Sequence, residues 1–148
     1  MKQLKVTLFN HQRAHKTTPR WIQKLARAAL PAIIAAAKTT EAPLLSLVEI
    51  EVSIVSDEEI ARVHADFLGD PTPTDVITFH HGEILVSADT AARQGAEHGQ
   101  DVDLELALYV VHGLLHLAGW EDHDPAEQTQ MHRLQEGILA TAVASLSQ

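Results

Sequence analysis

One segment constrains this chain more than any other. Residues 101–117 are apolar on nearly every side beyond the first turn, which is typical of a helix buried in the middle of a domain. Apart from the hydroxyl of Tyr109, the polar side chains past that turn are His112 and His116. Gly119 supplies the expected end of the helix. The segment therefore predicts a central helix that carries two histidines into the protein.

Sheet elements are predicted mainly before this helix, and helices dominate the later part of the chain. Alternating apolar side chains indicate strands over residues 2–10, 45–55, 76–80 and 83–87. This order favours an α+β fold, with a small mixed β-sheet packed against helices, in a single domain over residues 1–148. The other helices are predicted over residues 19–37, with a kink or an end at Pro31, over 56–69, over 87–94 with Gly95 as its stop, and from Pro125 to near the C-terminus.

The charge of the chain is divided unevenly. Residues 1–40 carry a local charge of +8 and hold no acid, whereas residues 41–148 carry −17 and hold all twenty acids. This division predicts a cationic face for an anionic partner on an otherwise acidic body. The alternative is that the charges only solvate a helix. The candidate contacts in the first predicted helix and just before it are Lys16, Arg20, Lys24 and Arg27.

Composition limits the available chemistry. The chain has ten histidines and no cysteine, so thiol catalysis and cysteine-bound zinc are excluded and any metal must be held by His, Asp or Glu. No run of about eighteen apolar residues occurs, which excludes a membrane-spanning helix. With no signal sequence before the first predicted strand, we expect a cytoplasmic protein.

His112 and His116 are spaced i, i+4, so both imidazoles lie on one face of the central helix and can approach one ion. After Gly119 the chain can turn back toward them with a third ligand. Two histidines, a turn and a third ligand make a three-ligand metal site with room for water. The alternative is a pair of core histidines satisfied by hydrogen bonds. The turn offers Glu121, Asp122, His123 and Asp124.

The other histidines singled out by spacing or position are expected to face solvent. His11 and His15 share the spacing of the central pair, but Arg13 and Lys16 beside them would repel a cation. The rest lie on helices with polar neighbours or at a predicted hairpin tip, namely His64, His132, His80 and His81.

Three ligands and an open position favour metal-assisted hydrolysis, since a metal lowers the pKa of bound water toward about 7. Gly113 separates two substrate classes, because HExxH peptidases carry their general base directly after the first histidine and glycine cannot act as a base. Glu121 could reach the water from the turn, so a zinc peptidase stays as a less favoured alternative. A phosphodiester substrate is favoured, and it suits the cationic segment.

Residues 112–120, HGLLHLAGW, strongly resemble the signature of the YbeY family of metal-dependent rRNA-maturation endoribonucleases. Residues 73–79, PTDVITF, and 82–84, GEI, are similar to two further motifs of that family. The resemblance covers roughly residues 45–140. It implies a single-strand-specific endoribonuclease in small-subunit rRNA 3′ end maturation and ribosome biogenesis. It also implies one Zn²⁺ per chain, with rRNA and the small ribosomal subunit as partners and no membrane or DNA partner.

Two positions depart from the family pattern. The third histidine of the family falls ten residues after the first, which here is Asp122, with His123 one place later. We favour Asp122 as the third ligand, because the helix and turn then keep their lengths and the last helix aligns without a gap. His123 is the alternative.

The second departure is Leu68, which stands where most members carry an arginine that contacts phosphate. The basic residues of the first helix could supply the missing contact. The loss of the arginine also raises a different hypothesis, a non-catalytic ribosome assembly factor in which the metal clamps the turn to the central helix.

Overall fold

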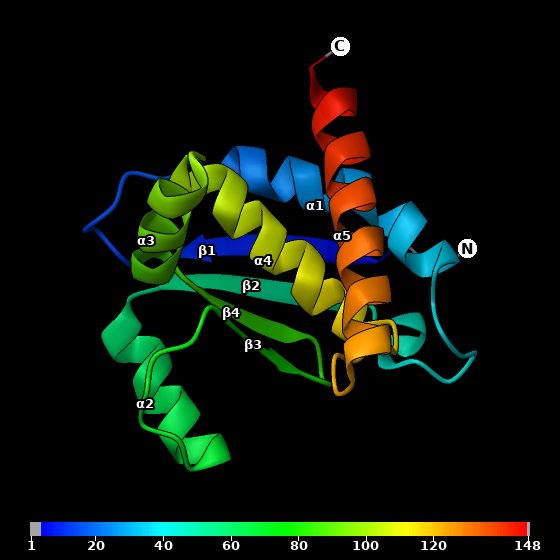
Figure 1. The fold of residues 1–148 in the computed structure, drawn as a ribbon, viewed down its shortest axis with the longest axis horizontal. Helices are drawn as coiled ribbons and strands as arrows, with labels where there is room; N and C mark the ends of the chain where they lie inside the picture. The colour runs from blue at the N-terminus through cyan, green and yellow to red at the C-terminus, as the bar shows by residue number, and fades with distance from the viewer. Residues whose placement is uncertain (1–3, 148) are drawn as a thin grey trace.

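The computed structural model describes residues 4–147 (Figure 1), so the first residues of the strand predicted over 2–10 lie outside the described residues. Within that range the chain forms a four-stranded sheet and five α-helices, as the α+β prediction requires. In chain order the elements are β1 (Lys5–Asn10), α1 (Pro19–Ala35), the short 3₁₀ helix η1 (Pro43–Ser46), β2 (Glu49–Val55), α2 (Asp57–Leu68), β3 (Val76–Phe79), β4 (Glu83–Ser87), α3 (Ala88–His98), α4 (Val102–Leu117) and α5 (Pro125–Leu146).

The sheet is mixed, with strand order β1-β2-β4-β3. β1 and β4 both run parallel to β2, while β3 pairs antiparallel with β4. Gly82 makes the β3–β4 turn possible, because its φ of 108° is a conformation that side-chain-bearing residues rarely adopt. The antiparallel hairpin places β3 at one edge of the sheet and leaves β1 at the other.

Helices cover both faces of the sheet (Figure 1). Ile84 and Val86 of β4 face the main core, which they share with buried residues of α1, α4 and α5. Leu85, between them, points to the opposite face and packs with Ile60 of α2 and Ile77 of β3. Burying side chains of this kind stabilises a fold by roughly 1.5–3 kcal/mol each. The sheet is therefore held between α2 on one side and a helical layer on the other.

α4 is the central helix that the apolar segment predicts. It contacts α1, α3, α5 and the β3–β4 hairpin, and most of its residues are buried. Gly113 faces the hairpin so closely that an added Cβ would lie 3.0 Å from Oγ1 of Thr78 and 3.1 Å from Cγ2 of Ile84. The helix can approach the sheet this closely only because residue 113 has no side chain.

Two helix ends differ from the prediction. α1 continues through Pro31 to Ala35, because Pro31 is exposed and the buried stripe of the helix carries on to Ile33. α3 runs to His98 rather than ending before Gly95, and its C-cap is Gly99 with φ 68°. Gly95 is buried inside the helix, where an added Cβ would lie 2.7 Å from the carbonyl oxygen of Gln100. Gly95 therefore allows a close backbone approach rather than a helix end.

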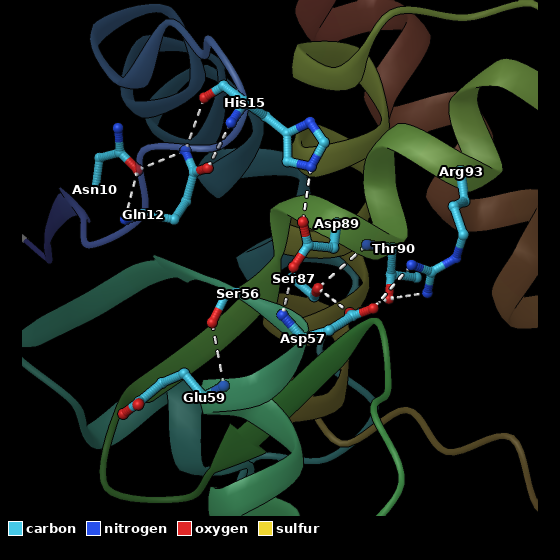
Figure 2. A network of polar contacts seen from close by, with 10 residues as sticks. All are labelled: Asn10, Gln12, His15, Ser56, Asp57, Glu59, Ser87, Asp89, Thr90 and Arg93. Carbon is cyan, nitrogen blue, oxygen red and sulfur yellow. Dashed lines mark hydrogen bonds and ion pairs between the residues drawn. The ribbon is translucent and has the colours of Figure 1, made fainter.

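A polar network joins the helices that follow the parallel strands (Figure 2). Asp57, the first residue of α2, accepts hydrogen bonds from the hydroxyls of Ser87 at 2.6 Å and Thr90 at 2.8 Å. It also pairs with Arg93 of α3 at 2.8 Å. Asp89 of α3 accepts a hydrogen bond from the backbone N–H of Asp57 at 2.8 Å. These reciprocal contacts tie α2 to α3.

His15 also belongs to this network, which corrects the prediction that it lies on the surface with His11. Nε2 of His15 lies 2.7 Å from Oδ1 of Asp89, and the residue is half-buried. His11 is exposed, as predicted. His15 therefore fastens the segment after β1 to α3.

The network makes stability depend on pH through Asp57. Burial by itself raises the pKa of this carboxyl group, but hydrogen bonds from Ser87, Thr90 and Arg93 outweigh burial and lower the pKa below its ordinary value. Such a group stabilises the fold above its unfolded-state pKa of about 3.9, and the contribution is lost as the pH falls through the folded-state pKa. We expect Asp57→Asn to lower the melting temperature by a few degrees at pH 7, with a difference that shrinks below about pH 4.

Thermal unfolding from pH 7 to pH 3 measures this effect. Asp66→Asn is the matched control, because Asp66 is exposed on the same helix outside the network. A difference between Asp57→Asn and the unchanged protein that stays constant over this range would contradict the assigned role of the carboxylate.

No helix within residues 4–147 combines the length and the apolar character needed to cross a bilayer.

Candidate metal centre

α4 brings His112 and His116 together near its C-terminal end. Their Nε2 atoms lie 3.0 Å apart, and the two rings meet edge to face. Two nitrogens bound to one tetrahedral zinc at about 2.0–2.1 Å are separated by about 3.3 Å, which is close to this distance. The pair is therefore spaced as two ligands of one ion.

The outer nitrogens of the same two rings are held by fixed acceptors. Nδ1 of His116 donates to the backbone carbonyl of Trp120 at 2.9 Å, and Nδ1 of His112 donates to Oε1 of Gln135 at 2.7 Å. In a neutral imidazole whose Nδ1 carries the proton, Nε2 is a bare acceptor. Two bare acceptors then face each other, an arrangement that a cation between them satisfies. The donor set thus fits a metal ion.

Electrostatics favours the form of His116 that binds metal. Burial lowers the pKa of His116 below its ordinary value, and the neighbouring His112 lowers it further, against smaller opposing effects of Trp120, Asp122 and Glu121. These effects favour the neutral form of the ring. Metal ligation requires the neutral ring, so the same effects favour ligation by His116.

Asp122 reaches the two histidines from the turn that follows α4. Gly119 allows this turn with a φ of 97°. Nε1 of Trp120 then donates to the carbonyl of Ala36 at 2.8 Å, which anchors the turn to the end of α1. One oxygen of Asp122 lies 3.9 Å from Nε2 of His112, and one ligand atom from each of the three residues lies within 4.8 Å of the others. Together they could hold a metal ion.

His123, the alternative third ligand, is directed elsewhere. Its Nε2 lies 2.5 Å from Oε2 of Glu121, and its side chain is 77% exposed. Within residues 4–147, the group of side chains that could share an ion contains Asp122 and does not contain His123. His123 is thus a surface residue that pairs with Glu121 and not with the two histidines of α4.

The hydrogen bond between Gln135 and His112, which orients the ring of His112, can be tested by mutation. Replacing Gln135 by Met keeps the volume of the side chain but removes the acceptor that orients His112. We expect zinc affinity to fall by about 10- to 100-fold, which is the usual effect of losing such an outer contact. Competition with a chromophoric zinc chelator measures it. Gln130→Met, on the same helix, is the control, and an unchanged affinity of Gln135→Met would contradict the orienting role.

A hollow of about 260 Å³ opens beside His116. Leu68 lines this hollow together with His116. The position at which most family members carry an arginine therefore lies next to the candidate metal centre. His64 and His80 line the hollow as well. His80 is exposed, as predicted, whereas His64 is half-buried. Sequence reasoning missed this pair because the two residues belong to elements that meet only in the folded chain.

The four basic residues assigned to RNA lie elsewhere. Among the residues that line the hollow there is no Lys16, Arg20, Lys24 or Arg27. α1 packs on β1, at the opposite edge of the sheet from β3. RNA binding by these residues stays a prediction, and any such contact is made at a distance from the hollow.

Comparison with known proteins places the chain in a family. The sequence pattern of the endoribonuclease YbeY family matches residues 7–143. The chain belongs to this family. Its similarity to an endoribonuclease YbeY of Gloeobacter violaceus is 39% identity over 111 residues, which is 62% of this chain and 57% of that protein. The alignment therefore spans less than two thirds of the length of this relative.

Other comparisons agree. The endoribonuclease YbeY of Symbiobacterium thermophilum is 33% identical over 67% of this chain and 74% of its own length. The solution structure of TM1509 from Thermotoga maritima superposes with a TM-score of 0.65 at 22% identity, covering 96% of this chain and 91% of that one. The similarity to the TM1509 structure shows a shared fold.

Proposed function

We propose that this YbeY-family protein is a metal-dependent endoribonuclease that cleaves single-stranded RNA. The observation that carries the proposal is the convergence of two bare imidazole nitrogens with Asp122 at the end of α4, next to an open hollow. Relatives at 33–39% identity are named endoribonucleases, which supports the same reaction.

We propose Zn²⁺ as the ion, since two imidazoles and one carboxylate are ligands that zinc accepts while keeping a position open. When bound, such an ion supplies an acidic water for hydrolysis and a positive charge for phosphate oxygens. His112 and His116 hold it through Nε2, while Gln135 and the Trp120 carbonyl keep the rings in that tautomer. Asp122 lowers the net charge of the site relative to a third histidine.

Gly113 supports a phosphodiester over a peptide. Glycine carries no general base, and an added Cβ at position 113 would already lie 3.0 Å from Oγ1 of Thr78 and 3.1 Å from Cγ2 of Ile84. Glu121, the other candidate base for a peptidase, is paired with His123. Both observations disfavour a zinc peptidase.

In the cell, the proposed substrate is rRNA, with maturation of the small-subunit 3′ end as the reaction and ribosome biogenesis as the process. The small ribosomal subunit is the proposed partner, and the cytoplasm, where that subunit is assembled, is the proposed location. Lys16, Arg20, Lys24 and Arg27 are proposed to hold RNA that extends beyond the hollow, through its phosphate charges.

The test is cleavage of a short RNA by the zinc-loaded protein, as a single strand and as a duplex of the same sequence. We expect cleavage of the single strand that disappears when the metal is removed and returns with added zinc. Metal-bound protein that binds the RNA without cleaving it would favour the assembly factor, the hypothesis that the loss of the family arginine at Leu68 raises. Absence of bound metal would contradict both.

A further inference from the structure

The hollow beside His116 has lining residues from three separate parts of the fold. It lies where the end of α2, strand β3 and the end of α4 meet, and its volume of about 260 Å³ falls below the roughly 300–1,000 Å³ of pockets that enclose a whole small molecule. It therefore suits one group of a longer ligand. The lining residues are His64, Leu68, Thr74, Val76, Ile77, Thr78, His80 and His116.

The polar groups of this lining are all imidazoles and hydroxyls. His64 and His80 join His116, and the hydroxyls come from Thr74 and Thr78. None of the eight lining residues is an acid, a lysine or an arginine. None of these residues carries a carboxylate that would repel an anion, and the hydroxyls and the N–H groups of imidazole are donors to which a phosphate oxygen can bind.

His64 is held in a definite orientation. Its Nδ1 donates to the backbone carbonyl of Thr72 at 2.8 Å, which leaves Nε2 as the atom free to meet a ligand. A protonated ring donates from Nε2 to a phosphate oxygen. The charged and titratable groups that face the ring are Asp70, from the loop after α2, with His80 and His116 across the hollow.

His80 is available for the same ligand. His80 is exposed and directly follows β3. Every tautomer of imidazole carries at least one N–H donor. The basic residues of α1, by contrast, do not line this hollow, and Leu68 contributes no charge to it.

We propose that His64 and His80 bind a phosphate group of single-stranded RNA in this hollow, directly beside the metal centre. The inference rests on the proposed endoribonuclease function and deepens it by naming the side chains that hold the substrate. They are positioning residues, because they fix a phosphate relative to His112, His116 and Asp122.

The test compares the zinc-loaded protein with the double variant His64→Ala/His80→Ala in binding a short fluorescent single-stranded RNA. We expect the dissociation constant to rise about tenfold or more. We also expect the slope of log affinity against log salt to become shallower by up to about 0.7 for each lost cationic contact. His132→Ala, an exposed helical histidine of α5 outside the hollow, is the matched control and should change neither quantity.

A gain-of-charge variant and a direct probe complete the design. Leu68→Arg places a cation on the same lining and should restore affinity to the double variant. In the unchanged protein, imidazole nitrogen resonances of His64 and His80 should shift on addition of the RNA, while those of His132 should not.

Equal affinity and salt slope in the double variant, or unmoved resonances of both histidines while RNA binds, would overturn this inference and leave the proposed function intact. Failure of the unchanged, zinc-loaded protein to bind single-stranded RNA would overturn both. Zinc content is measured in every variant, so that a lost metal is not mistaken for a lost phosphate contact.

Discussion

Replacing His112 by alanine is expected to lower zinc affinity by more than 100-fold and to abolish RNA cleavage. The substitution removes one of the three proposed ligands and leaves His116 and Asp122, which are too few to hold the ion. It also leaves the buried amide of Gln135 without its hydrogen-bond partner. Zinc content after gel filtration and cleavage of single-stranded RNA by the same preparation measure the two effects together.

Variants of the turn identify the third ligand. Asp122→Ala should lose zinc nearly as completely as His112→Ala, because its oxygen lies among the three converging ligand atoms. His123→Ala should keep zinc, because its ring faces Glu121 and solvent. If His123→Ala lost the ion and Asp122→Ala kept it, the third-ligand assignment would be reversed. If all three variants kept zinc, the proposed metal centre would be wrong.

Gly113→Glu is expected to destabilise the fold by about 3–5 kcal/mol, the usual cost of an uncompensated buried charge. The new Cβ would begin 3.0–3.1 Å from Thr78 and Ile84, and the carboxylate would follow into the packed contact between α4 and the hairpin. In a domain of about 150 residues this corresponds to a fall of roughly 10 °C in melting temperature. Denaturant and thermal unfolding measure it.

Gly137→Glu is the matched control for this prediction. Gly137 also lies inside a helix, but an added Cβ there meets no atom within 4 Å, and its position on α5 is exposed. Glutamate favours a helix over glycine, so we expect this variant to be as stable as the unchanged protein or slightly more stable. Equal stability of the two glutamate variants would contradict the tight contact at Gly113.

The two predictions concern neighbouring positions of one helix. His112 and His116 approach Asp122 of the following turn, and Gly113 packs against Thr78 and Ile84 of the hairpin. A glutamate directly after the first histidine, as in an HExxH sequence, would meet the packed contact with Thr78 and Ile84. Gly113, which disfavours a peptidase in the sequence, thus also has a packing role in the fold.

Local pattern predicted much of this architecture. The helix that became α4 was predicted because apolar residues surround it on every side, and the strands because apolar residues alternate along them. Errors arose where a single residue has a tertiary role. Glycine and proline are typical of helix ends, but Gly95 lies inside α3, where it leaves room for a neighbouring backbone. Pro31 lies on the exposed side of α1, and the buried side of that helix continues to Ile33.

The sequence by itself determined that two histidines lie one turn apart on a buried helix before a glycine turn, because the spacing of ligands along a helix is a local property. Only the tertiary structure decided which turn residue meets them, that His64 and His80 share a hollow with His116, and that the basic helix lies at the far edge of the sheet. These features depend on contacts between segments distant along the chain. Local periodicity carries no information about how such segments pack.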